Sequence, residues 1–324
     1  MTKQKRINII LVTIAIISIV LYLFSWFFLS KDLVTESAFK KIMNTRILHV
    51  VAITVSGILI ALASLSFQTI TNNRLLTPSM IGFDAIFVAT QTLLVFIFGQ
   101  NSSLFANDYF NFIISTVVML VVTLSLYGFI LKKNKNQIFV LLLVGMVIST
   151  LVRSLTGFLQ RVMNPTALDS VLSASMVSIT NINTTIILLV VPIMIVLIGL
   201  FYRRRAIYDA MALGEDVAIN LGVNYHVRTN ETMVYIAISL AISTALIGPV
   251  TFLGLVAVNI ARELLKSYSH KLVMIGSAAF AVISLVLGQL IIETLNLHVT
   301  VTVIINFLGG AYMIYLIWGV NKND

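Results

Sequence analysis

Residues 202–228 read YRRRAIYDAMALGEDVAINLGVNYHVR and gather charged side chains in an otherwise apolar chain. Apolar segments long enough to cross a bilayer, about 20 residues each, lie on both sides of them. Within this stretch the pattern Ala-x-x-Leu-Gly occurs at 210–214 and again at 218–222. Because Lys and Arg are concentrated on the cytosolic loops of membrane proteins, the arginines at 203–205 indicate that the stretch is cytosolic.

The composition of the whole chain is that of an integral membrane protein. Of its 324 residues, 59% are hydrophobic and only 10% are charged, and the mean hydropathy is +1.04. Soluble domains carry about 25% charged residues. About ten spans of about 20 residues would use nearly all of the chain. We therefore expect a single all-α, polytopic transmembrane domain over residues 1–324.

Ten apolar segments are expected to cross the membrane. They lie near 7–29, 47–70, 80–99, 112–131, 137–159, 184–201, 231–247, 250–265, 271–292 and 300–319. With the N-terminus inside, most of the 21 Lys and Arg residues fall on the cytosolic side, as the positive-inside rule requires. We therefore expect both termini in the cytosol. The same rule accounts for the net charge of +9, so we expect membrane lipid rather than nucleic acid as a partner.

The sequence contains no motif for ATP hydrolysis or metal binding. It has no GxxxxGK[ST] and no HExxH, its four histidines lie far apart, and it has no cysteine. Ion-coupled carriers usually hold ionisable groups near the middle of the membrane, whereas Asp84 and Glu293 stand at the ends of predicted spans. We therefore expect no catalytic residue, no metal site and no cofactor in this chain. Energy for transport would have to come from a partner.

Four short segments follow one another in a fixed order. They are Arg46-Ile-Leu-His49 before Gly57; Gln68 before Asn73-Arg74-Leu75 and Pro78; the repeat at 210–222; and Gly248-Pro-Val-Thr-Phe-Leu-Gly254-Leu before Arg262. Together they resemble the permease subunits of bacterial ATP-binding-cassette (ABC) importers for iron–siderophores, haem and vitamin B12, the FecCD type. The family patterns are Arg-Leu-Pro-Arg, Gln…Asn-Pro-Leu-Ala-x-Pro, Ala-x-x-Leu-Gly twice, and Gly-Pro-Ile-x-Phe-x-Gly-Leu followed by Arg. The resemblance covers nearly the whole chain after the first helix.

The resemblance implies a multi-pass permease of the bacterial cytoplasmic membrane that carries an iron–siderophore complex. Haem and vitamin B12 are the alternative cargoes, and an ion-coupled secondary transporter is the less favoured alternative mechanism. The implied partners are a second permease subunit, identical or different, two ATPase subunits that bind ATP, and an extracytoplasmic binding protein. The chain itself would not be an enzyme.

The resemblance also assigns roles to particular residues. Residues 206–223 would form two short cytosolic helices that dock on the ATPase. Gly214 and Gly222 can end helical turns with φ > 0, and Leu213, Ala218 and Leu221 would form a small apolar face. The full docking set is Ala210, Leu213, Gly214, Glu215, Ala218, Leu221 and Gly222.

Three further sets of residues match family positions. Arg46 and His49 match the positions that meet the binding protein. Asn73 and Leu75 match a segment near the cytoplasmic gate, with Leu75 as an apolar constriction. A structural motif comprises Gly248, Pro249, Gly254 and Arg262.

The chain departs from the family pattern at three places. His49 stands where the family has its second arginine and follows Leu48 in place of proline. Ala257-Val258-Asn259 replaces the usual Pro-His after Gly-Leu. Gln289 and Glu293 stand near the end of the ninth span, where the family usually has an Asp and an Arg. These departures leave open whether the permease pairs with itself or with a different chain.

Overall fold

The computed structural model describes residues 3–29, 36–133, 138–176, 184–295, 297 and 299–320. Helices joined by short connections make up this part of the chain, and none of it is a strand. The helices are α1 (Lys3–Leu29), α2 (Glu36–Ile70), η1 (Pro78–Ile81), α3 (Phe83–Phe98), α4 (Ser103–Ala106), α5 (Asp108–Lys133), α6 (Ile138–Val162), α7 (Pro165–Ser175), α8 (Thr184–Arg203), α9 (Arg205–Met211), α10 (Glu215–Asn220), α11 (Tyr225–Ile247), α12 (Leu253–Leu265), α13 (His270–Thr294) and α14 (Val301–Val320).

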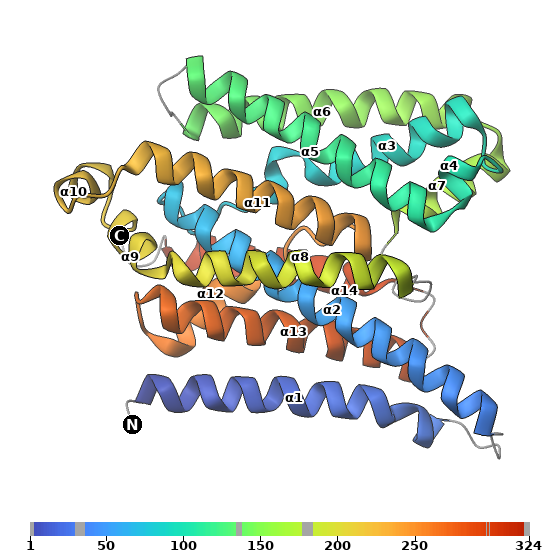
Figure 1. Ribbon diagram of the computed structural model, residues 1–324, viewed down its shortest axis with the longest axis horizontal. Coiled ribbons are helices and arrows are strands. Elements are labelled where there is room, and N and C mark those ends of the chain that lie inside the picture. The colour runs from blue at the N-terminus through green and yellow to red at the C-terminus, as the bar shows by residue number, and fades with distance from the viewer. Residues whose placement is uncertain are drawn as a thin grey trace.

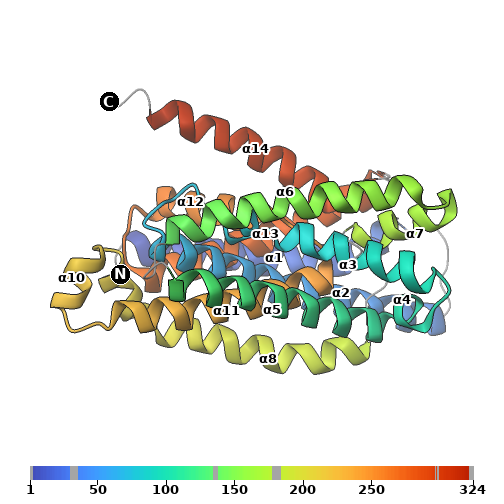
Figure 2. The same ribbon diagram turned by 90° about the horizontal axis from the view of Figure 1, so that it is seen from above.

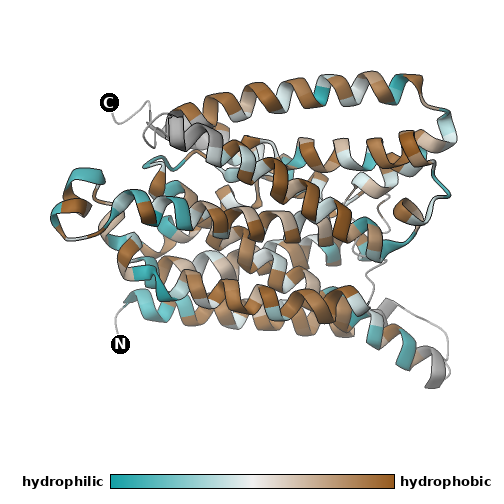
Figure 3. Ribbon diagram, turned by 45° about the horizontal axis from the view of Figure 1, so that its top comes forward, coloured by the Kyte–Doolittle hydropathy of each residue, from teal (hydrophilic) through white to brown (hydrophobic). Residues whose placement is uncertain are grey.

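Most of the long helices run side by side along one axis, and the short helices lie at the two ends of the bundle. Helices α9 and α10 lie at the same end as the start of α1 and the end of α14 (Figures 1 and 2). Helices α4 and α7 lie at the opposite end. Helix α14 diverges from the other helices toward its C-terminal end (Figure 2). Apolar residues cover the middle of the long helices, and hydrophilic residues gather toward the ends and on α9 and α10 (Figure 3). We call the end with α9 and α10 the inner end.

The all-α, polytopic membrane fold expected from composition is confirmed. Seven helices are long and apolar enough to cross a membrane. Helix α3 and the Val301–Tyr312 part of α14 are apolar but shorter, and α12 has 13 residues. Each of the ten expected spans coincides with one of these helices. The total of ten crossings and the cytosolic position of the termini stay predictions.

Helix α2 forms the centre of the bundle and packs against α8, α11, α12 and α13. Its small residues allow these neighbours to approach closely. Gly57 of α2 faces Leu285 and Ala281 of α13. Helix α12 also packs closely on α2: a Cβ at Gly254 of α12 would lie 1.8 Å from Ser64 Oγ of α2.

Two connections differ from the sequence-based expectation. Helix α2 begins at Glu36 rather than near residue 47, because residues 36–46 contain good helix formers and neither Pro nor Gly. The expected connector after the fifth span contains a regular helix, α7, which starts with Pro165 at its first position.

Candidate functional site

The repeated Ala-x-x-Leu-Gly segment forms two short helices at the inner end, as predicted. Helix α9 ends before Gly214, which has φ +98°, and α10 ends before Gly222, which has φ +82°. The N–H of each glycine closes the preceding turn, to Met211 O at 3.1 Å and to Ile219 O at 2.9 Å. A Cβ at either glycine would meet nothing within 4 Å, so backbone conformation rather than crowding favours glycine there.

The exposed apolar surface of this segment consists of Leu213, Val217, Ile219 and Leu221. Leu213 and Leu221 are 61% and 60% exposed. Ala218 is fully buried, so the expectation that it adds to the exposed face is wrong. In a helix of only six residues, Ala218 is the one apolar side chain that turns toward the bundle, and Val217 and Ile219 beside it point outward.

Helix α9 is fastened to the bundle through Asp209 and His270. The backbone N–H of His270, the first residue of α13, donates to Asp209 Oδ1 at 2.7 Å, and His270 Nδ1 lies 2.8 Å from the same oxygen. Partial burial works to raise the pKa of Asp209, but the bonds from His270 outweigh it and hold that pKa below its usual value. His270 Nε2 lies 2.7 Å from Thr69 Oγ1, near the end of α2.

Nothing in the local sequence indicates this connection, which therefore was not expected. Asp209 and His270 stand 61 positions apart, too far for a local sequence pattern to connect them. The connection joins α9 to the start of α13 and to the last turn of α2. The segment with Asn73 and Leu75 begins directly after that turn.

The segment with Asn73 and Leu75, which we call the gate segment after its expected role, is held by its own turn and by α12. Asn73 Oδ1 accepts the N–H of Leu75 at 2.9 Å. Asn259 of α12 donates to the backbone oxygen of Arg74 at 3.0 Å. Leu75 is half-buried and lines an inner-end cavity of about 410 Å³ that also includes Arg262. The structure thus brings the expected gate residues together with the structural motif.

The structural motif shapes the start of α12 and its contact with α2. Gly248 ends α11 with φ +85°, and its N–H donates to Thr244 O at 2.8 Å. Pro249 follows in the short link to α12, and Gly254 makes the close approach to Ser64. At the other end of α12, Arg262 donates to Gln68 Oε1 of α2 at 2.9 Å. Two residues of the resemblance, Gln68 and Arg262, are therefore direct partners.

Arg46 and His49 lie at the opposite, outer end, inside a buried polar cluster. Arg46 forms an ion pair of 2.8 Å with Glu293 of α13, and its side chain is only 12% exposed. The Arg46 guanidinium also lies 4.8 Å from the ring centroid of Tyr22 on α1. Tyr22 donates to Glu293 at 2.8 Å, and His49 is buried beside it. The sequence-based docking charges are thus placed as internal contacts between α1, α2 and α13.

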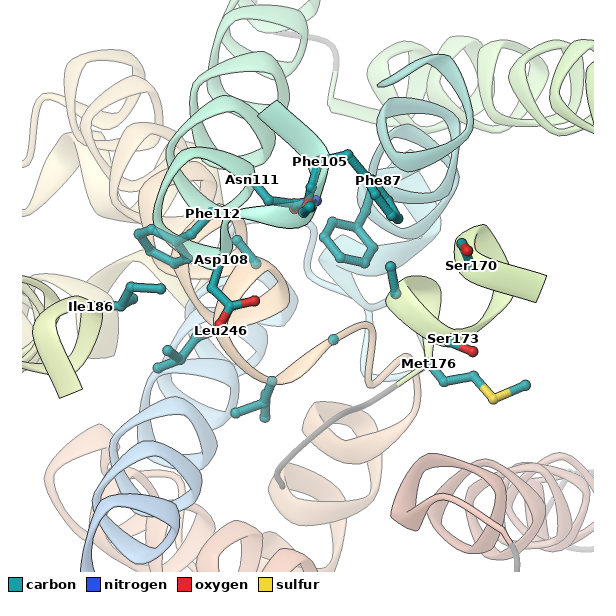
Figure 4. Close-up of a pocket in the computed structure, with 15 residues that line it drawn as sticks. Phe87, Phe105, Asp108, Asn111, Phe112, Ser170, Ser173, Met176, Ile186 and Leu246 are labelled. Carbon is teal, nitrogen blue, oxygen red and sulfur yellow. Dashed lines mark hydrogen bonds between the residues drawn. The ribbon is translucent and has the colours of Figure 1, made fainter. Parts of the chain in front are cut away.

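A cavity of about 440 Å³ lies at the outer end between α3, α4, α5, α7, α8 and α11. Figure 4 shows Phe87, Phe112 and Asn111 on one side of it and Ser170 and Ser173 of α7 on another. Its walls mix aromatic rings with polar groups. The sequence did not point to this cavity, because α7 looked like a connector. Among the described residues, no group of three His, Asp or Glu side chains could hold a metal ion.

The fold defines a polytopic helical membrane protein with two short helices exposed at one end. The sequence profile of the FecCD transport family matches residues 7–319, and the chain belongs to that family. It is 41% identical over 280 residues to the petrobactin import system permease protein YclO of Bacillus subtilis, covering 86% of this chain and 89% of YclO.

Other relatives match this chain over a similar number of residues. FatC, the petrobactin import system permease protein of Bacillus anthracis, is 30% identical over 88% of this chain and 80% of its own. FepG of Escherichia coli, a ferric enterobactin transport system permease protein, is 27% identical over 81% of this chain and 77% of its own. A solved structure described as an inward-facing metal-chelate type ABC transporter superposes with a TM-score of 0.80, covering 97% of this chain and 99% of its own at 18% identity. That last likeness concerns the fold.

Proposed function

We propose that this chain is the permease subunit of an ABC importer and that an ATPase subunit binds it at α9 and α10. The observation that carries the proposal is the pair of exposed leucines, Leu213 and Leu221, in the turns that follow the short helices α9 and α10 at the end opposite α4 and α7. Large apolar side chains gathered on a polar end of a protein are typical of an interaction surface. Family membership names the partner that would cover them.

The cargo in this proposal is an iron–siderophore complex of the petrobactin type. The support is the 41% identity with YclO, together with FatC, whose name refers to the same siderophore. These relatives favour a siderophore over the alternatives of haem and vitamin B12. The likeness to FepG supports the broader class of ferric siderophores.

The proposed assembly contains two permease subunits, identical or different, two ATPase subunits and an extracytoplasmic binding protein, in the bacterial cytoplasmic membrane. ATP would be bound by the ATPase subunits only. Arg46 and His49 could meet the binding protein only if their internal contacts open, because both side chains are largely buried here. Asn73 and Leu75 would form part of the inner gate.

The test is uptake of radioactive ferric petrobactin by Bacillus subtilis cells that lack YclO and express this chain. We expect uptake with the wild-type chain and none with Leu213→Arg at equal membrane levels. Ferric enterobactin and haem serve as competing cargoes. Uptake of another chelate, with no uptake of ferric petrobactin, would identify that chelate as the cargo instead. Uptake that persists when the ATPase is inactivated would contradict the ABC mechanism itself.

A further inference from the structure

The inner-end cavity of about 410 Å³ is lined by three cationic side chains. Arg74 comes from the gate segment, Arg262 from the last turn of α12, and Lys266 from the residue that follows α12. The other lining residues are Leu75, Asn259, Glu263, Ser267 and Tyr268. Arg74 lies over the ring of Tyr268, 5.8 Å from its centroid. The cavity therefore combines positive charge with one aromatic face.

These cations lack an acidic partner in the part of the chain that the structure describes. None of the ion pairs there includes Arg74, Arg262 or Lys266. Arg74 and Arg262 carry like charges and line the same cavity. Glu263 also lines the cavity, and its carboxylate accepts a hydrogen bond of 3.0 Å from Tyr312.

Among the described residues that line the cavity, positive charge exceeds negative charge. Glu263 offsets one of the three positive charges. The carbonyl end of α12 offsets roughly another half charge. More than one positive charge is left on a concave surface, where an anion would relieve the repulsion between the guanidinium groups.

The backbone around the cavity is fixed. Asn259 holds the carbonyl oxygen of Arg74 at 3.0 Å. Lys266 has φ +46°, a left-handed conformation uncommon for a side chain of its size, and its N–H donates to Arg262 O at 2.8 Å. Both Arg74 and Asn259 stand where the family pattern quoted above has other residues. The cavity is thus a built feature of this chain.

We propose that this cavity binds an oxyanion, a carboxylate or phosphate group, through Arg74, Arg262 and Lys266. Guanidinium groups match the geometry of such oxygens with paired hydrogen bonds. Given the proposed function, on which this step rests, the site would receive acidic groups of the chelate as it passes Leu75. The phosphate of an anionic lipid carries the same chemistry and is the other source.

The test measures anion binding to the purified full chain in phosphatidylcholine nanodiscs by calorimetric titration with citrate and with inorganic phosphate. We expect citrate to bind and Arg74→Gln and Lys266→Gln each to weaken binding about tenfold, the loss of one charge-assisted contact. Arg203→Gln removes the same charge from an exposed inner-end position and should leave binding unchanged. Nanodiscs with an equimolar share of phosphatidylglycerol distinguish the sources.

Weaker citrate binding by the wild type in the phosphatidylglycerol nanodiscs would assign the site to lipid phosphate, and unchanged binding would assign it to soluble anions. The proposal is overturned if Arg74→Gln and Lys266→Gln bind citrate and phosphate like the wild type in both membranes. Because this titration needs no ATPase, a wild-type chain that supports ATP-driven uptake but binds neither citrate nor phosphate overturns this inference alone. Anion binding without any ATP-driven uptake overturns the proposed function alone.

Discussion

His270, at the start of α13, donates its backbone N–H to Asp209 of α9 at 2.7 Å, and its ring contacts the same carboxylate. Through Thr69 the same ring reaches the last turn of α2, 2.7 Å away. Helix α9 therefore cannot shift relative to the bundle without straining or breaking contacts at both helices. A force applied by an ATPase at α9 would reach the segment with Asn73 and Leu75 by this route.

We predict that His270→Gln uncouples ATP hydrolysis from uptake. Glutamine cannot reach Asp209 and Thr69 with the geometry of the ring. Coupling energies of 1–3 kcal/mol correspond to about 5–150-fold effects, and we expect uptake per ATP hydrolysed to fall about tenfold while the ATPase still binds. The measurement is the ratio of chelate transported to ATP hydrolysed in proteoliposomes.

The matched control for that variant is His226→Gln. His226 lies on α11 at the same end, is half-exposed, and stands 3.4 Å from the exposed carboxylate of Glu215. Its contact is with the docking residue Glu215 and not between α9 and α13, so at equal ATPase binding its substitution should leave the ratio unchanged. Equal loss in both variants, or a wild-type ratio for His270→Gln, would show that the connection does not transmit coupling.

The apolar surface of α9 and α10 gives a second prediction. Leu213→Arg places a charge in the proposed contact with the ATPase, and Gly214→Trp puts a bulky residue at φ +98°. Both variants should insert into the membrane normally but lose copurification of the ATPase and lose uptake. Asn230→Arg adds the same charge at an exposed position of α11 and should retain both. Wild-type copurification with Leu213→Arg would move the docking surface elsewhere.

Much of this architecture could be predicted because its causes are local. Apolar length determines which segments can cross a bilayer, and an Ala-x-x-Leu-Gly repeat predicts turns with φ > 0 at Gly214 and Gly222. Helix α10 shows the limit of such reasoning. In six residues the helical period barely repeats, so only the packed structure reveals that Ala218 points inward while Val217 and Ile219 point outward.

The candidate sites depend on residues that are distant in sequence, which is why the sequence could not supply them. Arg46 and Glu293 are 247 positions apart, and Arg74 and Asn259 are 185 apart. A charge near the end of a span is equally compatible with a free docking group and with an internal ion pair. The packing of α1, α2 and α13 shows that Arg46 forms an internal ion pair with Glu293.

Close packing of α12 on α2 gives a third prediction. A Cβ at residue 254 would lie 1.8 Å from Ser64 Oγ and 2.6 Å from Ser64 Cβ. Gly254→Ala should therefore lower the free energy of unfolding of the purified protein by about 1–3 kcal/mol, the usual cost of overpacking. Adding Ser64→Gly should restore part of the loss because it removes both clashing atoms. Gly199→Ala, where nothing lies within 4 Å, is the control and should be neutral.

The outer-end ion pair gives a fourth prediction. Arg46→Met leaves the carboxylate of Glu293 without its cation in a largely buried site, which typically costs about 3 kcal/mol or more. The double variant Arg46→Met/Glu293→Leu should recover most of this loss, since no unpaired charge remains. The free energies of unfolding of the wild type, Arg46→Met, Glu293→Leu and the double variant, measured in one detergent, complete a double-mutant cycle. Strictly additive losses would mean that the pair contributes no interaction energy.

Asp84 provides the test between an ATP-driven permease and an ion-coupled carrier. It is buried near the start of α3 and accepts a hydrogen bond of 2.6 Å from Thr251, so an ion-coupled mechanism would depend on its charge. In the Asp84→Asn variant the side-chain amide oxygen can still accept from Thr251, and we therefore expect ATP-driven uptake within about threefold of the wild type, a difference below about 1 kcal/mol. A protonophore should have no effect on either protein in proteoliposomes, whereas withdrawal of ATP should stop both. Uptake that is abolished by Asp84→Asn and by the protonophore, but continues without ATP, would instead establish ion coupling.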